Sequence, residues 1–121
     1  MLQSVEWLKL PISPNGDTHS YQAYVCLFRP EEPTLRNVDR ISSQRNDLMM
    51  RLEENGIATR QGTHSPVIQG YYAEKYHLRP DEFPNAYIAD RLSLTLPLYV
   101  QLTQAEQELV SQNLRKGFEN A

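Results

Sequence analysis

The chain has 121 residues, of which 15 are acidic and 12 basic, giving a net charge of −3. This length suits one domain with its own core, and without a dense Lys/Arg run neither nucleic acid nor a membrane surface is an expected partner. No apolar stretch approaches the roughly 20 residues that span a bilayer, and the first residues lack the pattern of a signal peptide. A lone cysteine, Cys26, fits a reducing, cytoplasmic setting.

The first 29 residues predict a lead-in followed by a strand. Residues 1–19 contain Pro11, Pro14 and Gly16, a composition typical of extended chain and turns. Residues 20–29 (SYQAYVCLFR) are rich in Tyr, Val and Phe, with apolar groups on both faces. They predict a central strand covered on each side. We therefore divide the chain into a lead-in over 1–19 and one domain over 20–121.

A helix and a second strand are expected next. Residues 43–55 place Leu48 and Leu52 on one helical face, and Gly56 stands where a left-handed residue would end the helix. Residues 57–60 then predict a short strand, packed beside the first strand by a crossover connection.

The middle of the chain is less regular. Residues 67–76 predict a short helix that Pro80 brings to an end. Pro84 suits the first position of another helix, and Leu94–Leu96, closed by Pro97, predicts a strand.

The last helix has the clearest local signal. Thr103 and Glu106 form a capping box, in which the hydroxyl accepts from one backbone amide and the carboxylate from another. The apolar stripe of this helix comprises Leu109, Val110, Leu114 and Phe118. Together, these elements predict an α+β fold with a small sheet of about three strands packed with helices.

The polar run RQGTH, residues 60–64, is the main candidate for binding chemistry. The guanidinium of Arg60, the hydroxyl of Thr63 and the imidazole of His64 suit a diphosphate or sugar hydroxyls. The alternative is structural, with Arg60 paired to a surface carboxylate and His64 capping a turn. The residues alone leave both interpretations open.

Three tyrosines of the predicted 67–76 helix form a second candidate. Tyr71, Tyr72 and Tyr76 could line a sugar pocket, or they could pack on the sheet with their hydroxyls at its rim.

Other polar residues carry no readable chemistry. His19 and His77 form no metal-ligand spacing with each other or with Cys26, which behaves as a small hydrophobe in its strand. Asp81 and Glu82 lie close together, but nothing suggests acid/base work, and two charges in a loop are the default interpretation. We therefore predict no metal site.

Six blocks occur in an order and at spacings that resemble one family. They are HSYQAYV, EENGI, TRQGTH, GYYAEKY, FPNAYIADRLSLTLPLY and LTQAEQELV. This string, from about Leu8 to Phe118, resembles the C-terminal small domain of the DegT/DnrJ/StrS sugar aminotransferases. These are fold-type-I enzymes that depend on pyridoxal phosphate (PLP) and act on nucleotide-linked keto-sugars.

The resemblance implies that most of the PLP site lies outside this chain. In the family, a large domain preceding this segment supplies the Schiff-base lysine, the carboxylate facing the pyridine nitrogen, the stacking ring and the phosphate cup. The three lysines here, Lys9, Lys75 and Lys116, lie in polar contexts that would not lower a lysine pKa by desolvation. We expect no catalytic or cofactor-binding residue in this chain, with PLP implied only for the complete enzyme.

The resemblance also implies a substrate-facing loop. In the family, the loop that leaves the 57–60 strand faces the mouth of the active site, which makes Arg60, Thr63 and His64 candidate contacts for a nucleotide-sugar. Tyr71 and Tyr72 are further candidates. Many members carry a His-Tyr-Pro-like sequence here, whereas this chain reads THSP over residues 63–66.

We therefore expect a stand-alone or truncated C-terminal domain of a nucleotide-sugar aminotransferase, catalytically incomplete alone. Its expected partner is a large PLP-binding domain or chain, and a nucleotide-sugar would bind only in an intact enzyme. Two alternatives remain: a non-catalytic interaction module that forms homo-oligomers through an exposed apolar face, and a small-ligand-binding regulatory domain.

Overall fold

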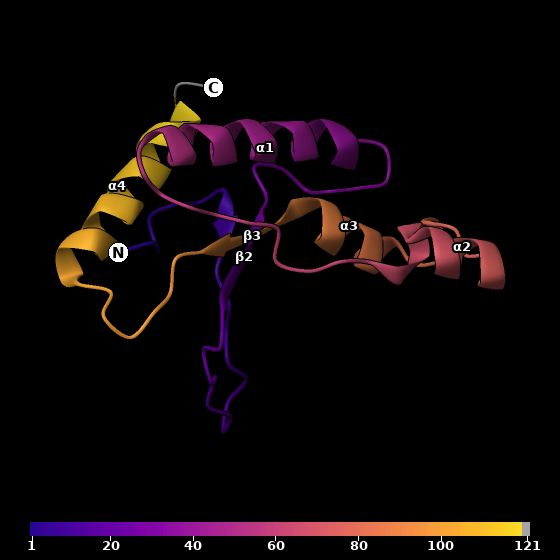
Figure 1. The fold of residues 1–121 in the computed structure, drawn as a ribbon, viewed down its shortest axis with the longest axis horizontal. Helices are drawn as coiled ribbons and strands as arrows, with labels where there is room; N and C mark the ends of the chain where they lie inside the picture. The colour runs from indigo at the N-terminus through magenta and orange to yellow at the C-terminus, as the bar shows by residue number, and fades with distance from the viewer. Residues whose placement is uncertain (120–121) are drawn as a thin grey trace.

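The computed structural model describes residues 1–119 and consists of one three-stranded sheet packed with helices (Figure 1). In chain order the elements are β1 (Leu8–Lys9), β2 (Tyr24–Phe28), α1 (Val38–Glu54), the 3₁₀ helix η1 (Pro66–Ile68), α2 (Gly70–Tyr76), α3 (Pro84–Leu92), β3 (Ser93–Leu96) and α4 (Gln104–Glu119). This confirms the predicted α+β class. Within residues 1–119, none of the helices combines the length and apolarity that a membrane-spanning segment requires.

The sheet has the order β1-β2-β3 with both pairs antiparallel, so β2 is the central strand, as predicted. Leu8 lies opposite Phe28, and Cys26 lies opposite Leu94. The strand begins at Tyr24, four residues later than predicted. Tyr21 adopts a left-handed φ of 49°, which interrupts the extended conformation that a strand requires.

Residues 1–19, expected as a lead-in, contribute β1 to the sheet and two buried side chains, Val5 and Leu8, to the core. The connection from β1 to β2 is a long loop that projects away from the body of the molecule (Figure 1). Rings stack along its returning arm, with centroids 4.4 Å apart for His19 and Tyr21 and 6.0 Å apart for Tyr21 and Tyr24.

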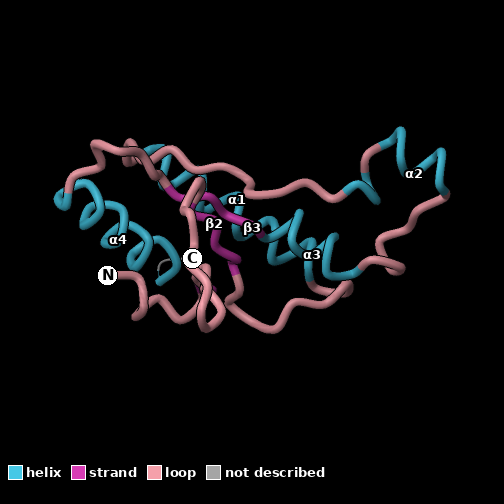
Figure 2. The backbone as a smooth tube through the Cα atoms, turned by 90° about the horizontal axis from the view of Figure 1, so that it is seen from below, coloured by secondary structure: helices cyan, strands magenta, loops and turns pink. Residues whose placement is uncertain are grey.

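The helix α1 covers the core side of the sheet and packs against both α3 and α4 (Figures 1 and 2). It begins at Val38, five residues before the predicted start, because its apolar stripe extends backwards through Val38 and Ile41, both fully buried. The same stripe continues through Leu48 and Leu52, which are also buried.

The end of α1 matches the prediction at Gly56, which has a φ of 75°. The amide of Ile57 donates to the carbonyl of Leu52, and the amide of Gly56 donates to that of Glu53, both at 2.9 Å. This is the Schellman arrangement, which favours glycine because its left-handed residue must avoid a Cβ clash.

The predicted strand over residues 57–60 is reduced to one bridge, and its predicted place is wrong. Arg60 pairs with Thr95 of β3, through N–O distances of 3.4 and 2.7 Å. The segment therefore lies on the far side of β3 from β2. Both edges of β2 are already taken by β1 and β3, so no free edge remains beside the central strand.

The predicted helix over 67–76 divides into η1 and α2, while α3 begins at Pro84 as predicted. The capping box of α4 is present: the Thr103 hydroxyl accepts from the Glu106 amide at 3.3 Å, and the Glu106 carboxylate accepts from the Thr103 amide at 2.8 Å. Of the predicted stripe on α4, Leu114 is fully buried, whereas Leu109 is 48% exposed. The side chain of Phe118 lies outside the described residues.

Candidate functional site

The segment 60–65 runs along β3 towards α3 and is fixed through its backbone. Beyond the Arg60 bridge to Thr95, the amides of Gly62 and Thr63 both donate to the Ser93 hydroxyl, at 3.0 and 3.2 Å. The amide of Ser65 donates to the carboxylate of Asp90 at 2.7 Å. The backbone of this loop is therefore held at three successive points.

Gly62 allows the loop to lie directly on the sheet. A Cβ atom at this position would lie 2.4 Å from Cγ1 of Val25 and 3.2 Å from side-chain atoms of both Ser93 and Thr95. A real Cβ does not approach a neighbour at 2.4 Å. Any other residue here would force either the Val25 side chain or the loop to shift.

A buried guanidinium supports the strand beneath the loop. Arg45 of α1 is 5% exposed and donates through Nη1 to the Ser93 carbonyl at 2.9 Å. Burial lowers the pKa of Arg45, the nearby Arg91 adds to this effect, and the carboxylate of Asp90 opposes it. Arg45 and Asp90 thus lie close enough to influence each other electrostatically on the inner side of the loop.

The side chains of the candidate residues Arg60, Thr63 and His64 are exposed, although the backbone that carries them is fixed. Among the residues that the structure describes, the guanidinium of Arg60 has no ion-pair partner, so the alternative of a surface ion pair is not observed. The ring of His64 is 3.1 Å from the Gln61 side-chain amide and 4.0 Å from the Asp90 carboxylate. These contacts, rather than a turn cap, define its surroundings.

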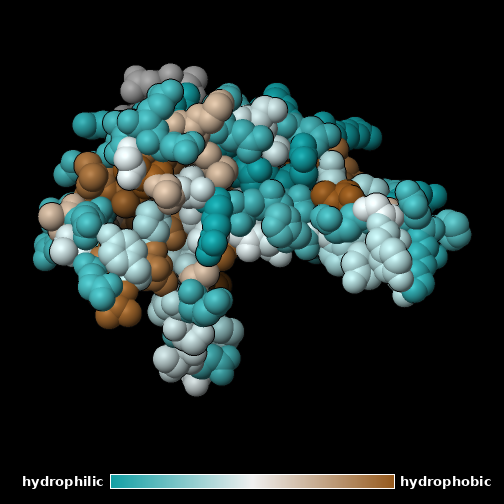
Figure 3. Space-filling model, viewed as in Figure 1, coloured by the Kyte–Doolittle hydropathy of each residue, from teal (hydrophilic) through white to brown (hydrophobic). Residues whose placement is uncertain are grey.

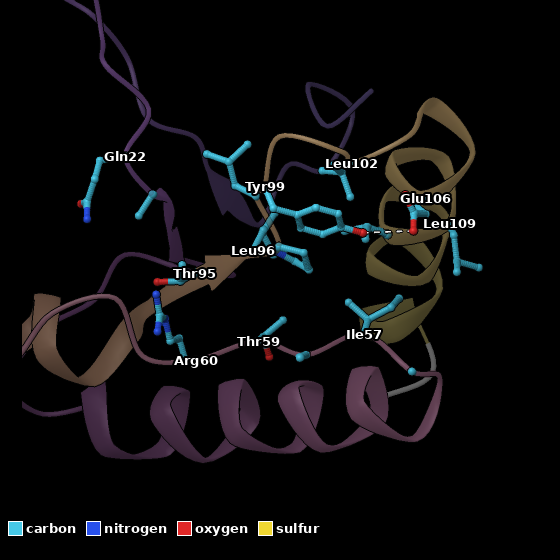
Figure 4. A pocket seen from close by; sticks show the side chains of 16 residues that line it. Gln22, Ile57, Thr59, Arg60, Thr95, Leu96, Tyr99, Leu102, Glu106 and Leu109 are labelled. Atoms are coloured by element: carbon cyan, nitrogen blue, oxygen red, sulfur yellow. Dashed lines mark hydrogen bonds between the residues drawn. The ribbon is translucent and has the colours of Figure 1, made fainter.

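Arg60 also lines one end of a groove of about 550 Å³ (Figure 4). The groove lies between the segment 56–60, the end of β3 and α4. Its walls are largely apolar, with side chains that include Ile57, Leu96, Leu102, Leu109 and Val110.

Tyr99 extends across this groove and donates its hydroxyl proton to Glu106 at 3.0 Å (Figure 4). Hydrogen bonds from the backbone and then the side chain of Thr103, with a further one from Tyr99, lower the pKa of Glu106. The Glu106 carboxylate therefore has its hydrogen-bond partners at the start of α4. Arg60 supplies a positive charge at the other end of the groove.

The tyrosines of α2 lie apart from this loop, at the end of the molecule remote from α4 (Figures 1 and 2). Tyr71, Tyr72 and Tyr76 are 64%, 46% and 56% exposed, so the alternative in which they pack on the sheet is not observed. They contact each other and Lys75, whose Nζ donates to the Tyr71 hydroxyl at 2.8 Å. The helix α2 buries no residue and lies away from the sheet (Figures 1 and 2).

The remaining candidates stay separate from the loop. His77 is the left-handed residue that ends α2, while Asp81 pairs with Arg79. Cys26 is buried in β2, and burial raises the pKa of its thiol to about 12. Among residues 1–119, no three His, Cys, Asp or Glu side chains gather in a way that could hold a metal ion.

Three residues that hold the loop were not singled out by sequence reasoning. Asp90 lies on the inner face of α3, four positions after Ala86. A carboxylate is unusual on a buried helix face, and this was the sequence signal that could have identified it. Ser93 sits in an apolar strand and Gln61 within the polar run, so neither carries a comparable signal.

Comparison with known proteins gives a consistent result. The sequence profile of the DegT/DnrJ/EryC1/StrS aminotransferase family matches residues 2–115. No curated protein has a sequence that matches this chain.

Solved aminotransferases share the fold. The aminotransferase TlmJ from Streptoalloteichus hindustanus is 25% identical, with a TM-score of 0.77 over 98% of this chain and 28% of its own. The putative sugar aminotransferase Spr1654 from Streptococcus pneumoniae, in its PMP form, is 18% identical. Its TM-score is 0.76 over 97% of this chain and 27% of its own. PseC from Helicobacter pylori, an aminotransferase of pseudoaminic acid biosynthesis, is 14% identical. Its TM-score is 0.79 over 99% of this chain and 29% of its own. The chain therefore spans less than a third of each of these proteins.

The close approach at Gly62 leads to a stability prediction. Gly62→Ala should lower the free energy of unfolding by about 1–3 kcal/mol, since the new methyl overlaps the stiff, branched side chain of Val25. Urea denaturation followed by circular dichroism measures this. Gly70→Ala is the matched control, because a Cβ there meets nothing within 4 Å, and it should not destabilise the protein. Equal stability of the Gly62→Ala variant and the unsubstituted protein would show that the loop does not lie on the sheet.

Proposed function

Because the chain belongs to the DegT/DnrJ/EryC1/StrS aminotransferase family, we propose that it forms the C-terminal small domain of a PLP-dependent nucleotide-sugar aminotransferase. The family match over residues 2–115 supports this, as does the coverage of only 28% of the TlmJ chain. In this proposal the domain is catalytically incomplete alone and contributes one wall of the substrate site. The single buried cysteine fits a cytoplasmic setting.

The observation that carries the proposal is the fixed loop with exposed polar side chains. Arg60, Thr63 and His64 offer a guanidinium, a hydroxyl and an imidazole from a backbone that is already ordered. Binding to such a loop loses little conformational entropy. A guanidinium can donate two parallel hydrogen bonds to phosphate oxygens, so Arg60 would bind the diphosphate, and Thr63 and His64 would orient it.

The adjoining groove has a size that suits a small ligand. Its volume of about 550 Å³ lies in the range of roughly 300–1,000 Å³ that is typical of small-molecule sites. Arg60 stands at its positively charged end, whereas its apolar walls would exclude water from one side of a bound molecule. We propose that the diphosphate of a nucleotide-sugar lies at this end of the groove in the intact enzyme.

PLP itself does not fit the described residues. When bound, PLP withdraws electrons from an attached amine, and this requires a lysine to hold it and a carboxylate facing its ring nitrogen. Lys9, Lys75 and Lys116 are all exposed to solvent, and the amine of Lys75 is engaged with Tyr71. We therefore propose that another domain or chain supplies the PLP site.

This leads to a direct prediction for the isolated polypeptide. After incubation with PLP and desalting, it should retain no visible absorbance band in one-to-one stoichiometry, because exposed lysines bind the aldehyde only weakly and reversibly. Absorbance spectroscopy measures the retained cofactor. A band that survives desalting at one PLP per chain, together with amino transfer, would show that the chain builds its own cofactor site.

Titration with UDP-glucose, a nucleoside-diphosphate sugar, tests the substrate loop. If the loop keeps part of its affinity outside the intact enzyme, amide resonances of residues 60–64 in the isolated chain should shift. Arg60→Met should then weaken binding about tenfold or more, the loss expected for a hydrogen bond to a charged group. Arg36→Met removes the same charge from an exposed position elsewhere and serves as control. Shifts extending to Tyr71 and Tyr72 would add α2 to the site. Shifts elsewhere would favour a regulatory small-ligand domain, and the absence of any response would favour a purely structural role.

A second function, a self-associating interaction module, is favoured by an exposed apolar surface. We call it the apolar patch; it comprises Leu98, Tyr99, Val100 and Leu109, and Figure 3 shows hydrophobic residues gathered over α4 and the loop that follows β3. Val100 is 97% exposed. Residues of the apolar patch line both the 550 Å³ groove and a neighbouring groove of about 540 Å³. Surfaces of this kind typically mark contacts between proteins.

If the apolar patch drives association, the chain should form a homodimer or larger oligomer at high micromolar concentration, and Val100→Glu should convert it to a monomer. Light scattering coupled to gel filtration measures the mass. Ile12→Glu is the matched control, because Ile12 is 79% exposed but lies in the projecting β1–β2 loop. A clean monomer of the unsubstituted chain would count against this function.

A further inference from the structure

The imidazole of His64 has a hydrogen-bond donor on its inner side. Nε2 of Gln61 donates to the carbonyl of Thr63 at 2.7 Å and lies 3.1 Å from Nδ1 of His64. The Thr63 carbonyl oxygen can only accept a hydrogen bond, so the Gln61 atom that contacts it must be the amide nitrogen. This contact fixes the orientation of the Gln61 side-chain amide, with its nitrogen pointing inwards. The same nitrogen then presents its second proton to Nδ1, which must act as the acceptor.

Asp90 occupies the other inner position. Its Oδ2 lies 4.0 Å from Nδ1 and accepts from the Ser65 amide at 2.7 Å, and the residue is 4% exposed. The other charged groups near this carboxylate are the buried guanidinium of Arg45 and the side chain of Arg91, which pairs with Asp39 on α1. The carboxylate therefore anchors the backbone next to His64 rather than binding its ring.

These contacts have a consequence for the neutral ring. When Nδ1 accepts a hydrogen bond, the single ring proton resides on Nε2, the nitrogen on the opposite side of the imidazole. The side chain of His64 is 72% exposed, so the Nε2 side is accessible to a ligand. A neutral ring in the opposite tautomer would instead present a lone pair at Nε2, which repels phosphate oxygens.

We propose that Gln61 is a positioning residue that fixes His64 in the Nε2–H tautomer, so that the neutral imidazole donates a hydrogen bond to a phosphate oxygen. The assignment of the ligand rests on the proposed function, whereas the assignment of the tautomer does not. Arg60 supplies the positive charge and His64 a directed donor. The loop therefore binds an anion without first having to protonate the histidine.

Nitrogen-15 NMR of the imidazole rings at about pH 8, where neutral imidazole predominates, tests the tautomer. His64 should show a protonated Nε2 and an unprotonated Nδ1. In Gln61→Glu the new carboxylate can only accept, so the ring proton should move to Nδ1. In Gln61→Met, which has a similar shape and no donor, the ring should show a mixture of the two tautomers.

The molecule provides internal references for this measurement. Nδ1 of His19 accepts from the Tyr21 amide at 2.8 Å, so its tautomer should stay Nε2–H in every variant. Within residues 1–119, the ring of His77 makes no hydrogen bond. It should therefore show the mixture of the two tautomers that is typical of an imidazole in water. Gln69→Glu introduces the same charge at an exposed position and should leave His64 unchanged. If His64 resembles His77 in the unsubstituted chain, or if Gln61→Glu leaves its tautomer unchanged, the inference is overturned.

A second measurement addresses the ligand, with inorganic pyrophosphate as the probe. Gln61→Met, which leaves the net charge unchanged, should weaken pyrophosphate binding by roughly two- to tenfold, the effect of one neutral hydrogen bond. Equal affinity of Gln61→Met and the unsubstituted chain would overturn the role of Gln61 in binding. If the tautomer inverts as expected but no form of the chain binds pyrophosphate, the positioning role stands and the proposed function of the loop fails.

Discussion

The arrangement of the candidate site depends on Ser93, a small buried residue at the start of β3. Its hydroxyl accepts hydrogen bonds from the amides of Gly62 and Thr63, and its carbonyl accepts one from Arg45 of α1. One residue thus joins the sheet, a helix and the polar loop. An unpaired buried polar group costs about 1–3 kcal/mol, so the three partners of Ser93 constrain one another. The loop can therefore take its observed path only while β3 and α1 are correctly packed.

Two buried charges on the inner side of the loop add to this constraint. Arg45 and Asp90 are each about 5% exposed or less, and removing a charged group from water is expensive unless it is paired or hydrogen-bonded. Asp90 lies in the last turn of α3, near the negative end of the helix dipole, which disfavours a carboxylate. The Ser65 amide and the charge of Arg45 offset this cost. Buried charges of this kind are weak evidence for overall stability, because their removal from water costs much of what their attraction returns.

The result is a loop with a hydrogen-bonded backbone and exposed polar side chains. A binding surface of this kind is already arranged before a ligand arrives, and this lowers the entropic cost of binding. Other parts of the surface are less well packed. The helix α2 has seven residues and buries none of them, and isolated helices of that length are marginal in water. The apolar patch is likewise exposed to solvent.

The sequence by itself determined the elements whose signals are local. The capping box at Thr103 and Glu106, the left-handed Gly56 and the helix start at Pro84 each depend on neighbours within a few residues, and each is observed. The apolar pattern of residues 20–29 likewise predicted a central strand, which is observed over Tyr24–Phe28. The six sequence blocks indicated the family, and they placed Arg60, Thr63 and His64 on one polar loop.

Only the tertiary structure decided where that loop lies and what holds it. Ser93 meets Gly62 across 31 positions, and Asp90 meets Ser65 across 25, distances over which no local pattern carries information. The segment 57–60 pairs with β3 rather than β2 because β1 takes the remaining edge of β2, a competition that involves the whole sheet. The exposure of Tyr71 and Tyr72 was also visible only in the tertiary structure, because it depends on where α2 lies relative to the core.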